Sequence, residues 1–493
     1  MYDLKTNEAV TKFAKKDSSG AIPMARMCTG SGLSALAMET MLDELNSSAL
    51  LPDGPLDGGR IRVKHVMVRE VDDKKQKWID SIAAFDNATK VPDVTLFGNA
   101  RCHDWCSKTM KDLDVPSEFA DAGFSRKDLS SLSEKQSAMI PYIAKALTDV
   151  DRSTLRMPAD FKMEGSTLPT LLSVMRYLII NRPALVFLEN VAQCRSIWPQ
   201  LLELFHHLRY VACLADTHTC NYLHPASRER VKMLFGQGRY LPGLRSTPDN
   251  ELRSFEDLWN QRILEIMARL KSPHRVPLES FLLPYDSPEL LDIVTRWSDP
   301  DMYIGPSVKW PKQHDELFKA LGNGVPGRPG PAQRTIFKNH MTHSISKLMF
   351  EKQLPRQQDI WIYSTLKSQF DACCLPGDAT VDISQTLGRT HIHYGISDCL
   401  TGSSVILLLK AERIFVGQEC LAIQGLTSQF APHMLDHSLC RLHWSLAGNS
   451  YAAGSAMAAM LALFESASVP GVARSSKRLK GKQSGWVSGT AQE

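Results

Sequence analysis

The sequence has no apolar stretch long enough to cross a bilayer as a helix. Its longest apolar run, YAAGSAMAAMLALF, spans only residues 451–464, whereas a membrane-spanning helix needs about 20 residues. Many of its side chains are small, so we predict a helix packed inside the protein. The polar N-terminal stretch also lacks the apolar segment of a secretory signal. We therefore expect no membrane partner.

The 11 cysteines form no CxxC pair and no regular pattern with histidines. A structural zinc site needs four such ligands at set spacings, so we expect no metal site. The odd number of cysteines and the missing signal favour free thiols in a reducing compartment. One close pair needs its own explanation. Cys102 and Cys106 lie four positions apart in LFGNARCHDWCSKT (96–109). Three interpretations are open for this pair: half of a metal site, a reactive cysteine loop, or two buried thiols.

A strong charge of one sign is also missing, since 57 basic and 53 acidic residues give a formal net charge of +4. A polyanionic partner must therefore be argued from local sites. Hydrophobic residues make up 43% and charged residues 22% of the chain, which is ordinary for a soluble globular protein. A length of 493 residues allows about two to four domains.

Strand-like and helix-like segments alternate in the first half of the chain. A strand, a glycine-containing turn and a helix are predicted at 23–45, and a second strand ends at Glu70. Another apolar strand is predicted at 91–102, a helix and a buried strand at 168–191, and a helix followed by two strands at 201–237. This alternation predicts an α/β fold with a mostly parallel sheet.

The alternation stops in two places, which define the predicted domains. Residues from about 107 to 165 are polar, and we interpret them as an insertion. After residue 240, prolines, aromatics and basic residues recur without an alternation of strands and helices. The end of the chain is polar and basic. We predict a flexible N-terminus at 1–20, a sheet domain at 21–245, a smaller irregular domain at 246–385, a return to the sheet domain at 386–465, and a basic disordered tail at 466–493.

The stretch CTGSG (28–32) places two glycines between a strand and a helix. Such a turn lets a ligand approach the helix N-terminus, although a simple tight turn has the same pattern. Glu70 ends the next strand, where an acidic residue binds a ribose diol in doubly wound folds. The 38 positions from Gly32 to Glu70 exceed the usual spacing because of a Pro- and Gly-rich loop. Together the two features favour a nucleoside-bearing cofactor.

Two further segments carry candidate site residues. Glu189 and Asn190 end the apolar strand in FLENV, at the sheet edge where ligands bind in such folds. Glu189 is also compatible with a helix cap or a solvated turn. Arg228 and Arg230 alternate along an extended segment and so share one side. Two such arginines can hold a phosphate or a base, or belong to a solvated strand edge.

The order of these segments resembles the cytosine-5 DNA methyltransferases. CTGSG stands where that family has its Phe-x-Gly-x-Gly loop, GNARC resembles Gly-Pro-Pro-Cys-Gln, FLENV contains Glu-Asn-Val, and PASRERV resembles Gln-x-Arg-x-Arg-Val. RIFVGQECLAIQGL and AGNSYAAGSAMAAMLALF resemble the family's last two segments. The resemblance covers about 20–245 and 385–465. It implies a Rossmann-like methyltransferase domain with a target-recognition domain between these parts.

The resemblance also implies a cofactor, a mechanism and a partner. The cofactor would be S-adenosylmethionine. Cys102 would be the catalytic nucleophile, with Glu189, Arg230 and, less directly, Arg228 on the target base. The partner would be double-stranded DNA with a flipped-out cytosine. This partner and the basic SSKRLKGK segment suggest that the protein is located in the nucleus, or in the cytoplasm if its origin is prokaryotic or viral. Protein partners stay open. The residues matching the cofactor site are Cys28, Thr29, Gly30, Ser31, Gly32, Glu70, Val71, Asp86 and Asn449.

Several positions depart from the family pattern. Arg101 and His103 replace the proline and glutamine beside the nucleophile, Ala226 replaces a glutamine, and Leu33 replaces a glycine. Two alternatives therefore stay open: a catalytically impaired protein that binds nucleic acid, and an RNA cytosine-5 methyltransferase. Cys106 is the alternative nucleophile, although the register from VPDVTLFG favours Cys102.

Overall fold

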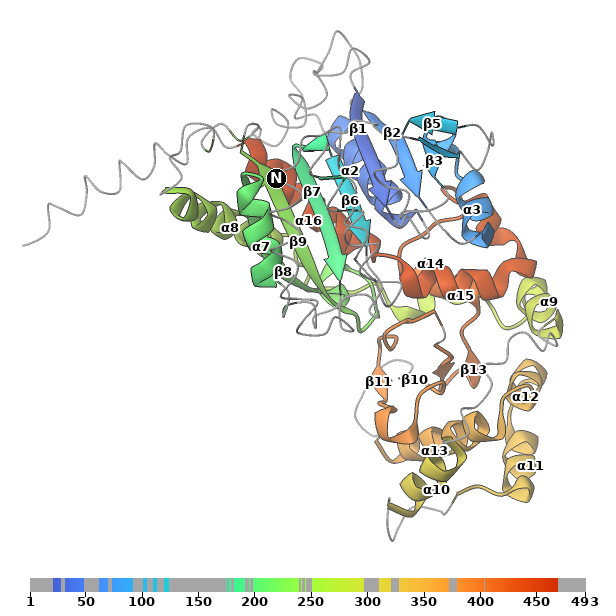
Figure 1. Ribbon diagram of the computed structural model, residues 1–493. Coiled ribbons are helices and arrows are strands. Elements are labelled where there is room, and N and C mark those ends of the chain that lie inside the picture. Colours follow the sequence, from blue (N-terminus) through green and yellow to red (C-terminus); the bar gives the residue numbers. More distant parts are fainter. Residues whose placement is uncertain are drawn as a thin grey trace, which may run out of the picture.

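The computed structural model describes two units, a large sheet with its helices and a smaller unit of helices and short strands (Figure 1). No helix among the described residues is long and apolar enough to cross a membrane. The described residues are 21–27, 32–47, 62–69, 73–91, 101–103, 110–112, 119–123, 174, 177–178, 181–190, 195, 198–238, 241, 244, 251–296, 310–320, 328–371, 379–402 and 404–468.

Among the described residues, the large sheet has seven strands in the order β3-β2-β1-β6-β7-β9-β8. The pairs β1–β2, β2–β3, β1–β6 and β6–β7 are parallel. Strand β9 is antiparallel to both β7 and β8, so it alone runs in the opposite direction. The fold is therefore mixed α/β. The strands are β1 (Ala21–Met27), β2 (Arg62–Arg69), β3 (Thr89–Val91), β6 (Phe119–Gly123), β7 (Leu185–Asn190), β8 (Tyr210–His218) and β9 (Glu229–Gln237).

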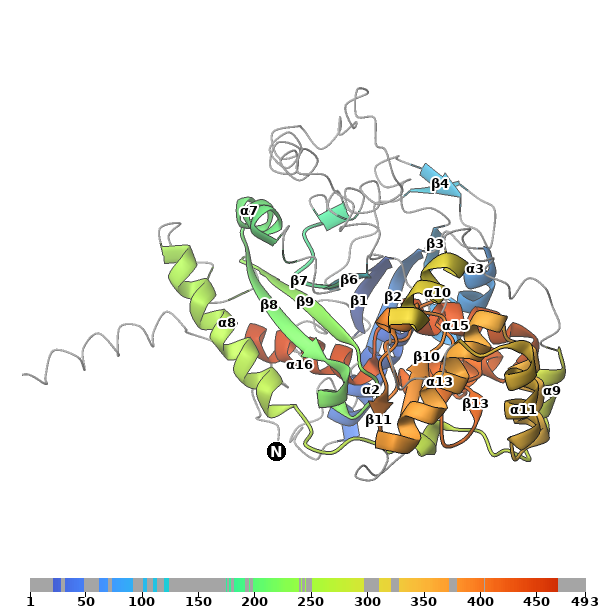
Figure 2. The same cartoon turned by 90° about the horizontal axis from the view of Figure 1, so that it is seen from below.

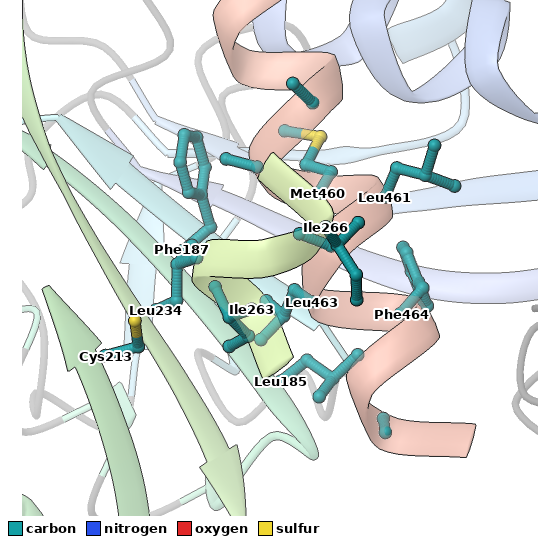
Figure 3. Close-up of a cluster of buried hydrophobic side chains, with 14 of the residues drawn as sticks. Leu185, Phe187, Cys213, Leu234, Ile263, Ile266, Met460, Leu461, Leu463 and Phe464 are labelled. Carbon is teal, nitrogen blue, oxygen red and sulfur yellow. The ribbon is translucent and has the colours of Figure 1, made fainter. Parts of the chain in front are cut away.

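Helices cover both faces of this sheet because its central strands are apolar on both sides, as in β7, where every residue is buried. On one face, α2 (Leu33–Ser47), α8 (Leu252–Arg269) and α16 (Ala453–Ser468) enclose a common core (Figure 3). On the other face, α7 (Trp198–His207) places Phe205 on Phe235, with ring centroids 3.6 Å apart. Helix α16 confirms the packed helix predicted at 451–464.

The packing moves the first predicted domain boundary. Helix α8 contributes Trp259 and Ile263 to the same core as Leu463 of α16, and Figure 3 shows the two helices side by side over the strands. Residues 251–269 therefore belong to the sheet unit, and the boundary expected at 246 is too early. A long amphipathic helix without a following strand carries no sign of the unit that it covers.

In the described part of the chain, the second unit combines five helices with a four-stranded antiparallel sheet in the order β11-β10-β12-β13. Its core extends from Leu290 to Cys440 and includes Leu407 and Ile414, so the end expected at 385 is also too early. The elements are α9 (Pro288–Arg296), α10 (Trp310–Ala320), α11 (Pro331–His340), α12 (Ser344–Glu351), α13 (Pro355–Asp371), β10 (Ala379–Asp382), β11 (His393–Tyr394), β12 (Ile406–Leu408) and β13 (Arg413–Ile414).

A buried ion pair joins the segment that enters this unit to the one that leaves it. Arg413 donates to both carboxylate oxygens of Glu419, at 2.9 and 2.6 Å, and each side chain is 1% exposed. The same two side chains bond the backbone carbonyl and N–H of Leu283. Glu419 lies in α14 (Gly417–Ile423), which packs against α15 (Cys440–Asn449). The pair thus ties the segment of Leu283 to residues 413–419, more than a hundred positions later in the chain.

The predicted insertion at 107–165 contains a strand of the main sheet, because β6 lies between β1 and β7. Its short, weakly apolar sequence FADAG gave no strand signal. Strands β4 (Arg101–His103) and β5 (Met110–Asp112) form a separate antiparallel ladder. The predicted N-terminal segment 1–20 and most of the predicted tail, 469–493, lie outside the described residues.

Candidate functional site

The connections of the large sheet reverse direction between β1 and β6. From β1 the chain proceeds outward to β2 and β3, whereas β6 is followed on its other side by β7. Ligands of open α/β sheets bind at such a point, beyond the carboxyl ends of the strands. Residues 28–31 follow β1 directly, and Glu70 and Val71 follow β2, but these predicted cofactor contacts lie outside the described residues.

Gly32, at the start of α2, is held in a left-handed conformation with φ of 79°. A Cβ atom there would lie 2.9 Å from Ile82 and 3.4 Å from Phe85. The glycine therefore allows a close approach to the 3-10 turn η1 (Ala83–Phe85). Asp86 caps that turn through its backbone N–H and is exposed. The structure thus brings two predicted cofactor contacts, Gly32 and the segment of Asp86, close together.

Glu189 is the last but one residue of β7 and only 5% exposed. Its Oε2 accepts a 2.6 Å hydrogen bond from Lys232, and Arg230 Nε lies 3.4 Å from Oε1. Because β9 runs antiparallel to β7, the start of β9 meets the carboxyl end of β7. The structure therefore joins Glu189 and Arg230 in a buried cluster, and Glu189 does not lie in a solvated turn.

Lys232 is the member of this cluster that the sequence analysis missed. It pairs with Glu189 across the two strands, and its side chain is fully buried. Burial lowers the pKa of Lys232 to about 8, although Glu189 opposes the shift. A signal was present, because positions 228, 230 and 232 all carry basic residues at period two. The third position was overlooked because it lies outside the resembling motif.

Arg228 is used differently from Arg230. It lies one residue before β9, is 3% exposed, and donates to the carbonyl oxygens of Leu400, Gly448 and Ser450, with shortest distances of 2.8, 3.2 and 2.7 Å. These bonds tie the sheet to two segments far along the chain. Burial lowers the pKa of Arg228 to about 10. The arrangement favours a structural role, and a contact of Arg228 with a ligand stays a prediction.

Asn449 ends α15, and its side-chain amide donates to the carbonyl of Ser445 at 2.8 Å. That contact lies within its own helix. The predicted role of Asn449 toward a cofactor therefore stays a prediction. Packing explains why a glycine stands at the neighbouring position 448, because a Cβ atom on Gly448 would meet the backbone of Thr401 and Gly402.

Replacing Gly448 by alanine is expected to lower the free energy of unfolding by about 1–3 kcal/mol, because backbone atoms cannot move aside as a flexible side chain can. The change also disturbs the carbonyl that accepts from Arg228. Urea denaturation measures the loss. Gly402→Ala is the matched control, since its nearest contact would be an ordinary 3.5 Å. Equal stability of the two variants would contradict this packing.

Cys102 lies in β4, where its backbone pairs with Lys111; its side chain and Cys106 lie outside the described residues. In the large sheet, the strand of Glu189 has β6 and β9 as its neighbours. Figures 1 and 2 show the β4–β5 ladder on the β3 side of the sheet, apart from β7. The proposed chemistry of Cys102 therefore rests on the sequence motif.

Within the same described part of the chain, no group of three or more His, Cys, Asp or Glu side chains is placed to hold a metal ion. Five described cysteines are free thiols: Cys213, Cys220, Cys399, Cys420 and Cys440. Burial raises the pKa of Cys213 and Cys440 to about 12, so these thiols are poor nucleophiles.

No protein-family model and no curated protein matches the chain. Solved structures with some likeness include the Entamoeba histolytica methyltransferase EhMeth, at 12% identity and a TM-score of 0.42. A putative DNA modification methyltransferase encoded within a prophage of E. coli has 12% identity and a TM-score of 0.43, and the S. pombe Dnmt2 methyltransferase has 9% and 0.42. Each comparison covers 90% of this chain and 98% of the other. Likeness at this level does not assign a function.

Proposed function

We propose that this protein transfers a methyl group from S-adenosylmethionine to C5 of cytosine in DNA. The observation that carries the proposal is the buried Glu189 carboxylate at the carboxyl end of β7, with Lys232 at 2.6 Å and Arg230 at 3.4 Å. It stands in a Glu-Asn-Val motif, within a series of motifs in the order of the cytosine-5 DNA methyltransferases.

The strand order supports a Rossmann-like domain. When the reversed strand β9 is set aside, the sheet reads third, second, first, fourth, fifth and sixth strand. This is the order of doubly wound sheets that bind dinucleotides at the point of reversal. A nucleoside-bearing cofactor would lie beyond the ends of β1 and β2, where the motifs also place it.

The described residues fit such a cofactor, because Gly32 supplies a turn that no side chain could occupy without meeting Ile82. The residues that would hold it are 28–32, Glu70, Val71, Asp86 and Asn449. The bound cofactor would supply an electrophilic methyl group. The N-terminus of α2 follows Gly32 directly and offers backbone N–H groups at this end of the sheet.

The other residues would act on the base. C5 of cytosine is a poor nucleophile, so the Cys102 thiolate first adds to C6, which makes C5 enamine-like. Glu189 binds the N3 and N4 edge and stabilises its protonated form, and Arg230 helps to hold the base. After C5 is methylated, a base removes the C5 proton and Cys102 leaves. The cytosine must be flipped out of the duplex, because the stack covers C5 and C6.

One observation favours a second candidate, a catalytically impaired protein that still binds nucleic acid. Strand β4 holds Cys102 in a ladder outside the large sheet, and Arg101 and His103 replace the residues of the family motif. An RNA cytosine-5 methyltransferase is the related alternative. Both are separated from the main proposal by assaying the same protein on DNA and RNA.

Replacing Cys102 by serine is expected to abolish methyl transfer, because a hydroxyl is a far weaker nucleophile than a thiolate. The measurement is incorporation of tritium from labelled S-adenosylmethionine into duplex DNA, with an RNA substrate in parallel. Cys106→Ser is the matched control and should keep activity. A 5-fluorocytosine oligonucleotide should form a covalent adduct with the parent protein and the Cys106 variant only.

The reverse result, with activity lost only in the Cys106 variant, would show that the nucleophile is Cys106. Transfer to RNA alone would establish the RNA alternative. No transfer to either nucleic acid by the parent protein would refute the enzymatic proposal and leave the impaired binding protein.

A further inference from the structure

We infer that Lys232 is a positioning residue for Glu189: its ammonium group holds Oε2 of the carboxylate and leaves Oε1 to face the bound base. This role rests on the function proposed above and deepens it. It assigns a buried basic residue that lies beyond the resembling Arg-x-Arg motif.

The two oxygens of Glu189 have different partners. Lys232 Nζ donates to Oε2 at 2.6 Å, a short charge-assisted hydrogen bond. Arg230 Nε lies 3.4 Å from Oε1, which is longer than a good N–H···O bond. Oε1 is therefore the oxygen that can take a further N–H donor. The Arg230 side chain remains 14% exposed. Of the three residues of the cluster, Arg230 lies furthest toward the carboxyl end of β7.

The ammonium group cannot turn away to solvent. Lys232 is 0% exposed, and its Nζ lies 5.4 Å from the ring centroid of Phe187 and 5.5 Å from that of Tyr451. Strand β8 places Ala215 opposite Lys232. The apolar surroundings make an unpaired charge costly, so Lys232 and Glu189 constrain each other.

The charged groups that act on Lys232 are Glu189 on β7 and the nearby Arg228 and Arg230. The other neighbouring elements contribute uncharged groups: β8 contributes Ala215, and the segment before α16 contributes the ring of Tyr451. Burial lowers the pKa of Lys232 to about 8. Above that pH the amine loses its charge and holds Glu189 less firmly. Activity should therefore fall as the pH rises through about 8.

The first experiment measures kcat and KM for methyl transfer between about pH 6 and pH 10, which spans the pKa of Lys232. Lys232→Met is expected to lower kcat at least about tenfold, while KM for S-adenosylmethionine stays unchanged. Lys232→Arg keeps a charge that is not lost in this range. It should retain more activity than the methionine variant, without the decline above pH 8.

The matched control is Glu256→Gln in the same unit. Glu256 is also a buried charged side chain, and it accepts from His206 and from the backbone N–H of Ala212. The Glu256→Gln variant should be less stable than the parent. Its activity per folded molecule should nevertheless show the same pH profile as that of the parent. The inference is overturned if Lys232→Met keeps the parent's kcat and pH profile, or loses activity only in proportion to its folded fraction.

A second experiment does not depend on enzymatic activity. Urea denaturation of Lys232→Met, Glu189→Gln and the double variant forms a double-mutant cycle. The double variant is expected to lose less stability than the sum of the single variants. The parent's midpoint should also rise relative to Lys232→Met between about pH 8 and 10.5, because only the unfolded chain keeps the Lys232 proton there.

The two experiments fail separately. A parent protein that transfers no methyl group to DNA or RNA refutes the proposed function, whatever the cycle shows. Additive losses in the cycle show that Lys232 does not hold Glu189 and overturn the positioning role, whatever the activity of the parent.

Discussion

Methyl transfer by the Glu189→Gln variant is expected to be about 10²–10⁴-fold slower than that of the parent protein, the range for a lost acid–base group. Glutamine keeps the shape of the side chain but has no charge to stabilise a protonated base. Its Nε2 amide group would also face Lys232 or the base with a donor where the parent has an acceptor. The defect should therefore appear mainly in kcat.

The matched control for this variant is Glu229→Gln. Glu229 begins β9 at the same edge of the sheet but is exposed, so the loss of its charge should change the rate little. Single-turnover assays with labelled cofactor separate the chemical step from product release. Glu189→Gln retaining the parent's rate while folded would remove the central observation behind the proposed function.

Arg413→Met is expected to lower the free energy of unfolding by about 3–5 kcal/mol, the usual cost of removing one partner of a buried ion pair. The variant leaves Glu419 as a charged group that is 1% exposed. Glu419 would keep its bonds from the N–H groups of Leu283 and Val416 but lose both bonds from the guanidinium. The loss is measured by urea denaturation.

The double variant Arg413→Met/Glu419→Gln should recover part of this stability, because no uncompensated charge is then buried. Arg441→Met, at an exposed position of α15, is the surface control and should change stability by no more than about 0.5 kcal/mol. A double variant less stable than Arg413→Met alone would show that the cost comes from lost packing and not from the charge.

This ion pair explains a motif that the sequence alone only located. RIFVGQECLAIQGL resembles a family segment with Arg and Glu at set positions, and these two residues are Arg413 and Glu419. The structure shows that they bind each other and Leu283 of a segment more than a hundred positions earlier. A sequence pattern cannot name that third partner, since the contact depends on how two units pack.

Most strands and helices of the large sheet were predictable, because they are marked by local periodicity. The apolar run before Glu189 became β7, and the alternating residues from 229 to 237 became β9. The apolar segment after residue 450 became α16. Strand β6 was missed because FADAG carries neither alternation nor a run of large apolar side chains. Its place between two buried strands makes it part of the sheet.

The sequence by itself determined which side chains share a face, because the period of two within a strand is a local property. This period places Arg230 and Lys232 on the same side of β9. Only the tertiary structure decided that β9 runs antiparallel beside β7 and brings Lys232 opposite Glu189. It likewise decided that Arg228 bonds residues 400, 448 and 450. Strand register and long-range contacts follow from burying both faces of the whole sheet, which no single segment of sequence contains.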